Sequence, residues 1–237
     1  KNGVRSLLMG GQACVLYGAA EFSRDTDIVT VADADNLRRL QAAVKELRAD
    51  RIAVPPFERR FLEAGHAVHF RCQLPGAEGI WLDVMSKIRG LPYFTVLWDR
   101  RTTLETGGET IEVLSLPDLV AAKKTQRDKD WPMITRLVEA HYAQHLDVTD
   151  ETVIRFWLRE LRSPAILIDV ARSAPTVCES LLHARPLLQH AVAGSEELLK
   201  ATLREEEDAE READRHYWAP LKRELEQLRR EHRRSRE

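Results

Sequence analysis

The chain has 237 residues, and 43% of them are hydrophobic, which is enough for a core in one large or two small domains. Its formal net charge is −2, so a polyanionic partner would have to meet a local basic patch. The three cysteines, Cys14, Cys72 and Cys178, match neither a disulfide framework nor a zinc spacing, which favours a reducing compartment. No apolar run reaches the ~18 residues of a membrane span, and no signal peptide is visible. We therefore expect a cytoplasmic protein without a membrane partner.

The first candidate site lies between residues 7 and 31. This stretch reads as a short apolar strand, a turn at Gly10 and Gly11, a short helix, and a strand that begins with Asp25-x-Asp27. Side chains two residues apart project from the same face of a strand, and paired carboxylates suit divalent cations. Backbone N–H groups at a glycine pair before a helix can hold a phosphate. The combination predicts phosphoryl or nucleotidyl transfer.

A third carboxylate would strengthen this prediction, because Asp-x-Asp alone is common; the chain repeats it at Asp33-x-Asp35 and Asp128-x-Asp130. Asp83 is the candidate, since it lies inside an apolar run of strand length over 79–86. Asp83 either faces water on an edge strand, or it points at the same metals as the first pair. Both interpretations remain open at this stage.

The remaining elements of the first half follow from periodicity. Asp33 or Asp35 is expected as the N-cap of the first long helix. His66 and His69 fall on opposite faces of a strand and so do not form a metal pair. The predicted elements are a helix over 35–48, a hairpin of strands 66–73 and 79–86, a hairpin of strands 102–106 and 110–114, and a helix that starts at 115–118 and includes Lys123.

The second half is expected to be helical throughout. We predict a boundary between domains 1–146 and 147–237, the latter ending in a long charged helix from Ser195. Pro220 predicts a break or kink in that helix. The arginine-rich end of the helix is either solvated or contacts RNA phosphates or an acidic partner.

Three short motifs carry a resemblance to a known family. MGGQACVLYG, SRDTDI and WLDVMS resemble the nucleotidyltransferase superfamily of the polymerase-beta-like fold, nearest the AbiEii-like nucleotidyltransferase toxins. The later segment SLPDLVAAKKTQRDKD is similar to the family's helix start and its following basic residues. The resemblance implies an α/β fold: a small mixed-sheet nucleotidyltransferase domain followed by an all-helical C-terminal domain. It also implies the functional residues, which are Asp25, Asp27 and Asp83 as catalytic metal ligands and Gly10, Gly11, Ser23, Lys123 and Arg127 as nucleotide contacts.

The implied reaction moves a nucleoside monophosphate from an NTP to RNA, a protein hydroxyl or a small molecule, with Mg²⁺ or Mn²⁺. As a toxin, such a chain would be paired with a cognate antitoxin. The chain departs from the family pattern at several positions: Glu21 stands where the family usually has Arg, Ser23 where it usually has Thr, and the spacing from Lys123 to Arg127 differs by about one residue. The main departure is the negative charge of Glu21. This negative charge favours the alternative of a catalytically inactive binding or assembly module with the same fold.

Overall fold

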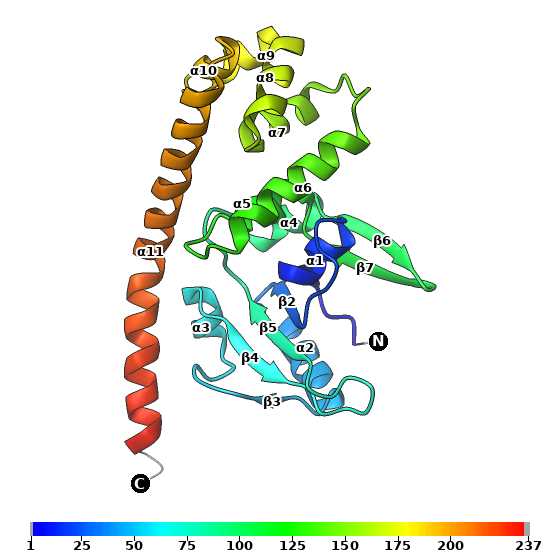
Figure 1. Ribbon diagram of the computed structural model, residues 1–237. Coiled ribbons are helices and arrows are strands. Elements are labelled where there is room, and N and C mark those ends of the chain that lie inside the picture. Colours follow the sequence, from blue (N-terminus) through cyan, green and yellow to red (C-terminus); the bar gives the residue numbers. More distant parts are fainter. Residues whose placement is uncertain (1, 235–237) are drawn as a thin grey trace. The chain divides into compact units, whose positions relative to one another are not determined.

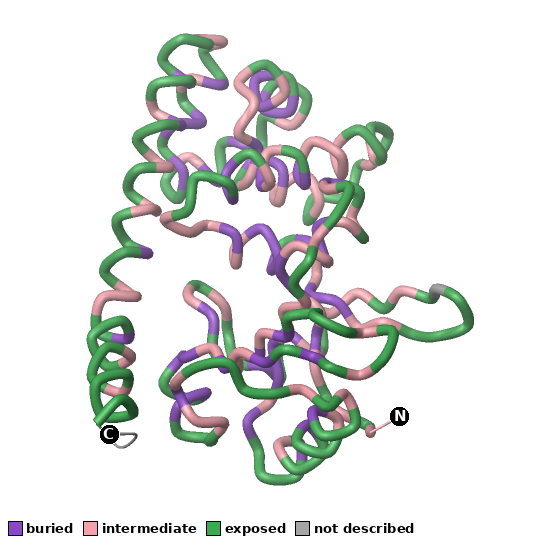
Figure 2. The backbone as a smooth tube through the Cα atoms, turned by 60° about the horizontal axis from the view of Figure 1, so that its bottom comes forward, coloured by how far each residue is buried: buried purple, intermediate pink, exposed green. Residues whose placement is uncertain are grey.

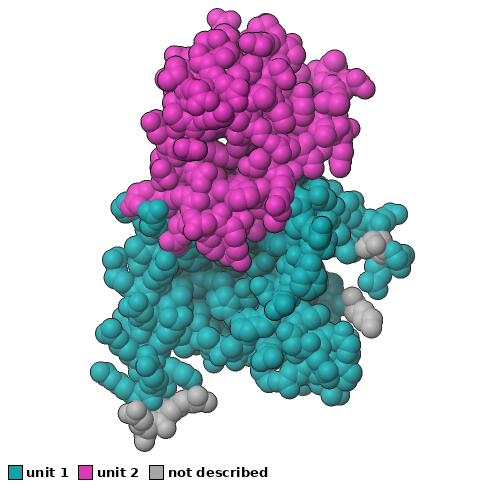
Figure 3. Space-filling model, in the orientation of Figure 1, with its two compact units in different colours: residues 1–122, 215–237 teal, residues 123–214 magenta. Residues whose placement is uncertain are grey.

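The protein is described by a computed structural model that covers residues 2–234 (Figure 1). The chain divides into two compact units, and each is treated separately below (Figure 3). Unit 1 comprises residues 1–122 together with 215–237, and unit 2 comprises residues 123–214. The boundary predicted after residue 146 falls inside unit 2, between two of its helices.

Unit 1 is built on a seven-stranded mixed sheet with the order β3-β4-β5-β2-β1-β7-β6. The β2–β5 and β1–β7 pairs are parallel and the other neighbouring pairs are antiparallel. This confirms the predicted class of a mixed α/β sheet with a helical C-terminal region, and both predicted hairpins. The strands are β1 (Ser6–Met9), β2 (Asp25–Thr30), β3 (Asp50–Arg51), β4 (Val68–Arg71), β5 (Trp81–Met85), β6 (Thr102–Thr106) and β7 (Glu109–Val113).

One face of the sheet carries the core of unit 1. Alternate residues of β4 and β5, such as Phe70 and Val84, pack with Leu40, Val44 and Leu62 of the helices in one buried cluster. Because strand side chains alternate between faces, Asp83 and His69 project from the opposite face. The helices of unit 1 before residue 123 are α1 (Gly10–Leu16), α2 (Ala34–Glu46), α3 (Arg59–Ala64), α4 (Phe94–Asp99) and α5 (Leu116–Ala122).

Local sequence signals account for the ends of several elements. Asp33 is the N-cap of α2, and its side chain accepts a hydrogen bond of 2.8 Å from the backbone N–H of Asn36. β5 lies inside the sheet, which excludes the edge-strand position that was one of the two interpretations of Asp83. The predicted place of Lys123 within the helix is wrong, because Lys123 lies in the turn after α5.

Unit 2 is helical, as predicted for the second half of the chain. The buried guanidinium of Arg185 donates to Glu206 and to two carbonyls at the C-terminal end of α7, those of Leu158 and of the C-cap Leu161. This satisfies helix-end carbonyls that have no intrahelical partner. The helices are α6 (Asp130–Gln144), α7 (Glu151–Glu160), α8 (Pro164–Ser173), α9 (Pro175–Leu181), α10 (Leu188–Val192) and the first part of α11 (Glu196–Arg234).

α11 continues through Pro220, so of the predicted break or kink the break is wrong. Most of its residues are exposed (Figure 2). Within unit 1, its last part packs on the turn between α3 and β4, where the buried His66 lies 2.8 Å from the carboxylate of Glu224. None of the helices between residues 2 and 234 has both the length and the apolar character that a membrane crossing requires.

Candidate active site

Two of the predicted carboxylates lie opposite each other on neighbouring strands. Asp27 of β2 and Asp83 of β5 are register partners in a parallel pair, and such strands lie about 4.8 Å apart. Register partners project from the same face, and Asp25 shares that face because it lies two residues before Asp27. The structure therefore brings Asp25, Asp27 and Asp83 to the face of the sheet opposite α2.

The glycine pair lies directly beside this carboxylate group. Gly10 has a φ of +68°, and a Cβ atom built on it would lie 2.5 Å from Cγ of Asp27. A Cβ on Gly11 would lie 2.9 Å from Cβ of Ser23, whose hydroxyl donates to the carbonyl of Asp25 at 3.2 Å. No side chain larger than hydrogen fits at either position without displacing its neighbour. The bare backbone of both glycines is thus placed against the predicted metal and nucleotide residues.

A histidine that the sequence prediction did not include belongs to the same face. His69 of β4 is the register partner of Asp83, and its Nδ1 lies 2.7 Å from Oδ1 of that residue. This hydrogen bond raises the pKa of His69; burial opposes the rise, and the charges of Asp83 and Asp27 add to it. The sequence carried a signal for this contact, since a hairpin of strands 66–73 and 79–86 brings the two residues within a few positions of each other. The strand pattern had related His69 only to His66, on the opposite face.

The donor set of this face fits a hard divalent cation. Carboxylate oxygens are the ligands that Mg²⁺ and Mn²⁺ prefer, and the Asp27 carboxylate occupies the space that a Cβ on Gly10 would need. One oxygen of Asp83 is held by His69, and its Oδ2 makes no hydrogen bond within residues 2–234. In that part of the chain, no three His, Cys, Asp or Glu side chains are already gathered closely enough to ligate one ion.

The predicted nucleotide contacts Lys123 and Arg127 lie in unit 2, where both pair with the buried Asp130. Nζ of Lys123 is 3.2 Å from Oδ1 of Asp130, and Nε of Arg127 is 2.8 Å from its Oδ2. Burial alone would raise the pKa of Asp130, but Lys123, the Thr125 hydroxyl and Arg127 together lower it. The structure thus places these two cations around an internal carboxylate and not in the unit that carries Asp25, Asp27 and Asp83.

Glu21, the main departure from the family pattern, is exposed in the loop between α1 and β2. Within the described residues it forms no ion pair, so its negative charge is not neutralised there. Its loop leads directly into Ser23 and Asp25. The same loop also contains Arg24, so its formal net charge is zero.

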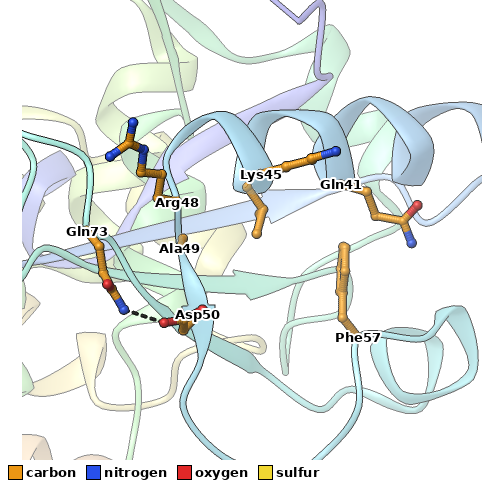
Figure 4. Close-up of a pocket in the computed structure, with 8 residues that line it drawn as sticks. Gln41, Lys45, Arg48, Ala49, Asp50, Phe57 and Gln73 are labelled. Atoms are coloured by element: carbon orange, nitrogen blue, oxygen red, sulfur yellow. Dashed lines mark hydrogen bonds between the residues drawn. The ribbon is translucent and has the colours of Figure 1, made fainter.

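A separate hollow lies on the other side of the sheet, beside the C-terminal end of α2 (Figure 4). Among the described residues that line it, Asp50 is the only carboxylate, and the amide of Gln73 donates to it. None of the predicted site residues contributes to this hollow. Its lining residues are Gln41, Val44, Lys45, Arg48, Ala49, Asp50, Phe57 and Gln73.

Comparison with known proteins assigns no family to the chain. No protein-family model matches it, and no curated protein sequence matches it. Its structure is similar to the crystal structure of an antigenic nucleotidyltransferase-like protein from Paracoccidioides brasiliensis. That similarity covers 80% of this chain and 84% of the other, with a TM-score of 0.41 and 19% sequence identity. A likeness of this degree does not assign an activity.

Proposed function

We propose that the chain is a metal-dependent nucleotidyltransferase that moves a nucleoside monophosphate from an NTP to an acceptor hydroxyl. The observation that carries the proposal is the placement of Asp27 opposite Asp83 on one sheet face, with the Gly10 backbone against Asp27. A pair of carboxylates next to a backbone segment without side chains is suited to a metal-bound triphosphate.

In the proposed reaction the three carboxylates of the face divide the work. Asp25 and Asp27 would hold Mg²⁺ or Mn²⁺, and Asp83 would bind the catalytic cation and help to accept the proton of the acceptor hydroxyl. When bound, the cations stabilise the negative charge on the attacking and leaving oxygens. The acceptor oxygen forms a bond to the α-phosphorus, the bond to the bridging oxygen breaks, and pyrophosphate leaves.

Backbone N–H groups at Gly10 and Gly11 would hold the β- and γ-phosphates, with the Ser23 hydroxyl beside them. Lys123 and Arg127 are proposed to offset triphosphate charge. Each already balances Asp130, so a phosphate contact would have to compete with that carboxylate.

The finer parts of the proposal rest on the short motifs alone. These are membership of the AbiEii-like branch, a toxin role with a cognate antitoxin, and RNA, a protein hydroxyl or a small molecule as the acceptor. A cytoplasmic location is also proposed, because the reaction needs NTPs and because Cys14, Cys72 and Cys178 are buried and form no disulfide within residues 2–234.

The test is label transfer from each α-labelled NTP in the presence of Mg²⁺ and cell extract. The wild-type protein should transfer label to one fraction of the extract, and the double variant Asp25→Ala, Asp27→Ala should lose this activity by about 10³-fold or more, as on removal of metal ligands. The single variant Asp35→Ala removes an exposed acid from α2 and should retain activity. Label transfer that survives in the double variant would overturn the assigned roles.

The exposed charge of Glu21 favours a second candidate function, an inactive module that keeps the fold. Calorimetric titration with Mg-ATP and with Mg-GTP separates the two proposals. An enzyme should bind at least one nucleotide only when the metal is present, and the Asp25→Ala, Asp27→Ala variant should lose this binding. An inactive module should show no metal-dependent binding in either protein.

A further inference from the structure

We propose that His69 is a positioning residue of this site: its imidazole holds Asp83 through one oxygen and so presents the other oxygen to a divalent cation. The catalytic role of this contact rests on the proposed function. The orientation of Asp83 by His69 can be tested separately, by metal binding to the protein without turnover.

The geometry of the contact fixes which group donates. An ionised carboxylate only accepts hydrogen bonds, so the ring nitrogen facing it, Nδ1 of His69, carries the hydrogen. The bond is 2.7 Å long, and the two residues are direct partners in the antiparallel β4–β5 pair. Because both backbones are fixed by the sheet, neither side chain can move far while the bond persists. Oδ1 of Asp83 is therefore committed to His69, and Oδ2 is left for a ligand.

The location of the contact argues against an ordinary surface pair. The side chains of His69 and Asp83 are 37% and 24% exposed, on an inner strand and its neighbour. Asp27 is the register partner of Asp83 on the other side of β5 and adds its charge to the environment of His69. Arg229 of α11 lies close enough to act on the ring with the opposite sign. The three side chains of His69, Asp83 and Asp27 thus form one row across β4, β5 and β2.

A row of this kind has a physical use. Groups that hydrogen-bond to metal ligands orient the ligand atoms, and their loss typically weakens metal affinity or activity by about 10- to 100-fold. Without the imidazole, the carboxylate of Asp83 would rotate among several conformers, and only some of these would direct an oxygen toward Asp27. His69 therefore lowers the conformational cost of assembling the cation site.

Three substitutions of His69 separate the effect of its hydrogen bond to Asp83 from the effect of its side-chain size. Asn carries its amide nitrogen at the position of Nδ1, two bonds beyond Cβ, whereas Gln carries it at the position of Nε2. His69→Asn should therefore keep the hydrogen bond to Asp83, and His69→Gln and His69→Ala should lose it. The exposed His183 of unit 2 provides the control variant His183→Ala.

The first readout is Mn²⁺ affinity, measured by electron paramagnetic resonance on the nucleotide-free protein. His69→Ala and His69→Gln should bind Mn²⁺ about 10- to 100-fold more weakly than wild type, and His69→Asn should stay within about threefold of it. Circular dichroism melting of each variant shows whether the fold is retained. Equal affinity in wild type, His69→Ala and His69→Asn would overturn the inference, and so would a loss that Asn does not rescue in a folded protein.

The second readout is the Mg²⁺ dependence of label transfer. The concentration of Mg²⁺ at half-maximal rate should rise about 10- to 100-fold in His69→Ala, with a smaller change in the KM for NTP. If the wild type transfers no label with any NTP but binds Mn²⁺ with the predicted ranking, the proposed function fails and the positioning role stands. If the wild type is active and His69→Ala matches it in both readouts, the positioning role fails and the function stands.

Discussion

At the scale of single residues, the glycine pair is explained by space as much as by phosphate binding. Gly10 has a left-handed φ of +68°, and its Cα lies so close to the Asp27 side chain that a Cβ atom would not fit between them. Gly18, just beyond the other end of α1, has a similar φ of +75°, but a Cβ added there would meet nothing within 4 Å. Gly10 and Gly18 therefore both need a positive φ, and they differ in that only Gly10 has a carboxylate next to its Cα.

This difference leads to a matched prediction. Gly18→Ala should destabilise the protein by about 1 kcal/mol, the cost of a side chain at positive φ. Gly10→Ala should cost about 1–3 kcal/mol more, because the new methyl group must displace Asp27. Urea unfolding measures both effects, and Mn²⁺ titration should show weakened binding only in Gly10→Ala. Equal stabilities and equal Mn²⁺ affinities in the two variants would show that the contact with Asp27 is unimportant.

At the scale of elements, local signals predicted much of the fold. The apolar stripe of α2, with Asp33 as its N-cap, and the glycines between β6 and β7 determine structure within a few residues, so the sequence alone was sufficient. The strand order was not accessible in this way, because it depends on contacts between distant segments. For this reason the sequence left two interpretations of Asp83 open and did not predict its contact with His69.

The last part of α11 shows the same limit. The spacing of its apolar residues predicted a helix, but it did not predict which residues the helix packs against. Leu221 is buried, Glu224 lies 2.8 Å from Nε2 of His66, and a Cβ on Gly65 would be 3.0 Å from the Tyr217 hydroxyl. These contacts attach residues 217–224 to the turn between α3 and β4, within unit 1. The segment that follows carries Arg229 toward His69.

We therefore expect Leu221→Ala to release this part of the helix without unfolding the sheet. Truncating a buried leucine costs about 2–5 kcal/mol, and here the loss falls on one helix packed through few side chains. Hydrogen exchange followed by mass spectrometry should show faster exchange in residues 215–234 and unchanged exchange in β1, β2 and β5. Lys222→Ala, at the exposed neighbouring position, should leave all of these segments unchanged. Unaltered exchange in both variants would contradict the proposed anchoring role of Leu221.

At the scale of the whole molecule, the acid response should be dominated by two carboxylates of unit 2, the buried Asp130 and the half-buried Glu206. Asp130 is 2% exposed and is surrounded by Lys123, Thr125 and Arg127. Burial of Glu206 would raise its pKa, but Arg185 and Arg162 outweigh that effect and lower it. A carboxyl whose pKa is lower in the folded state contributes stability above its unfolded pKa of about 4, and this contribution is lost as the pH falls through the folded value.

Asp130→Asn tests this account, because it removes the charge and retains the shape. At pH 7 the variant should be about 3 kcal/mol less stable, since Lys123 is left buried without its counter-charge. Between about pH 5 and pH 3 the wild type should lose stability more steeply than the variant, so the two unfolding free energies should converge. Urea unfolding across this range and at neutral pH gives both curves. Asp128→Asn is the control, because its side chain is 99% exposed and its pairing with Arg211 lies at the surface. Parallel curves for wild type and Asp130→Asn would mean that the Lys123–Asp130 pair does not set the acid stability of the protein.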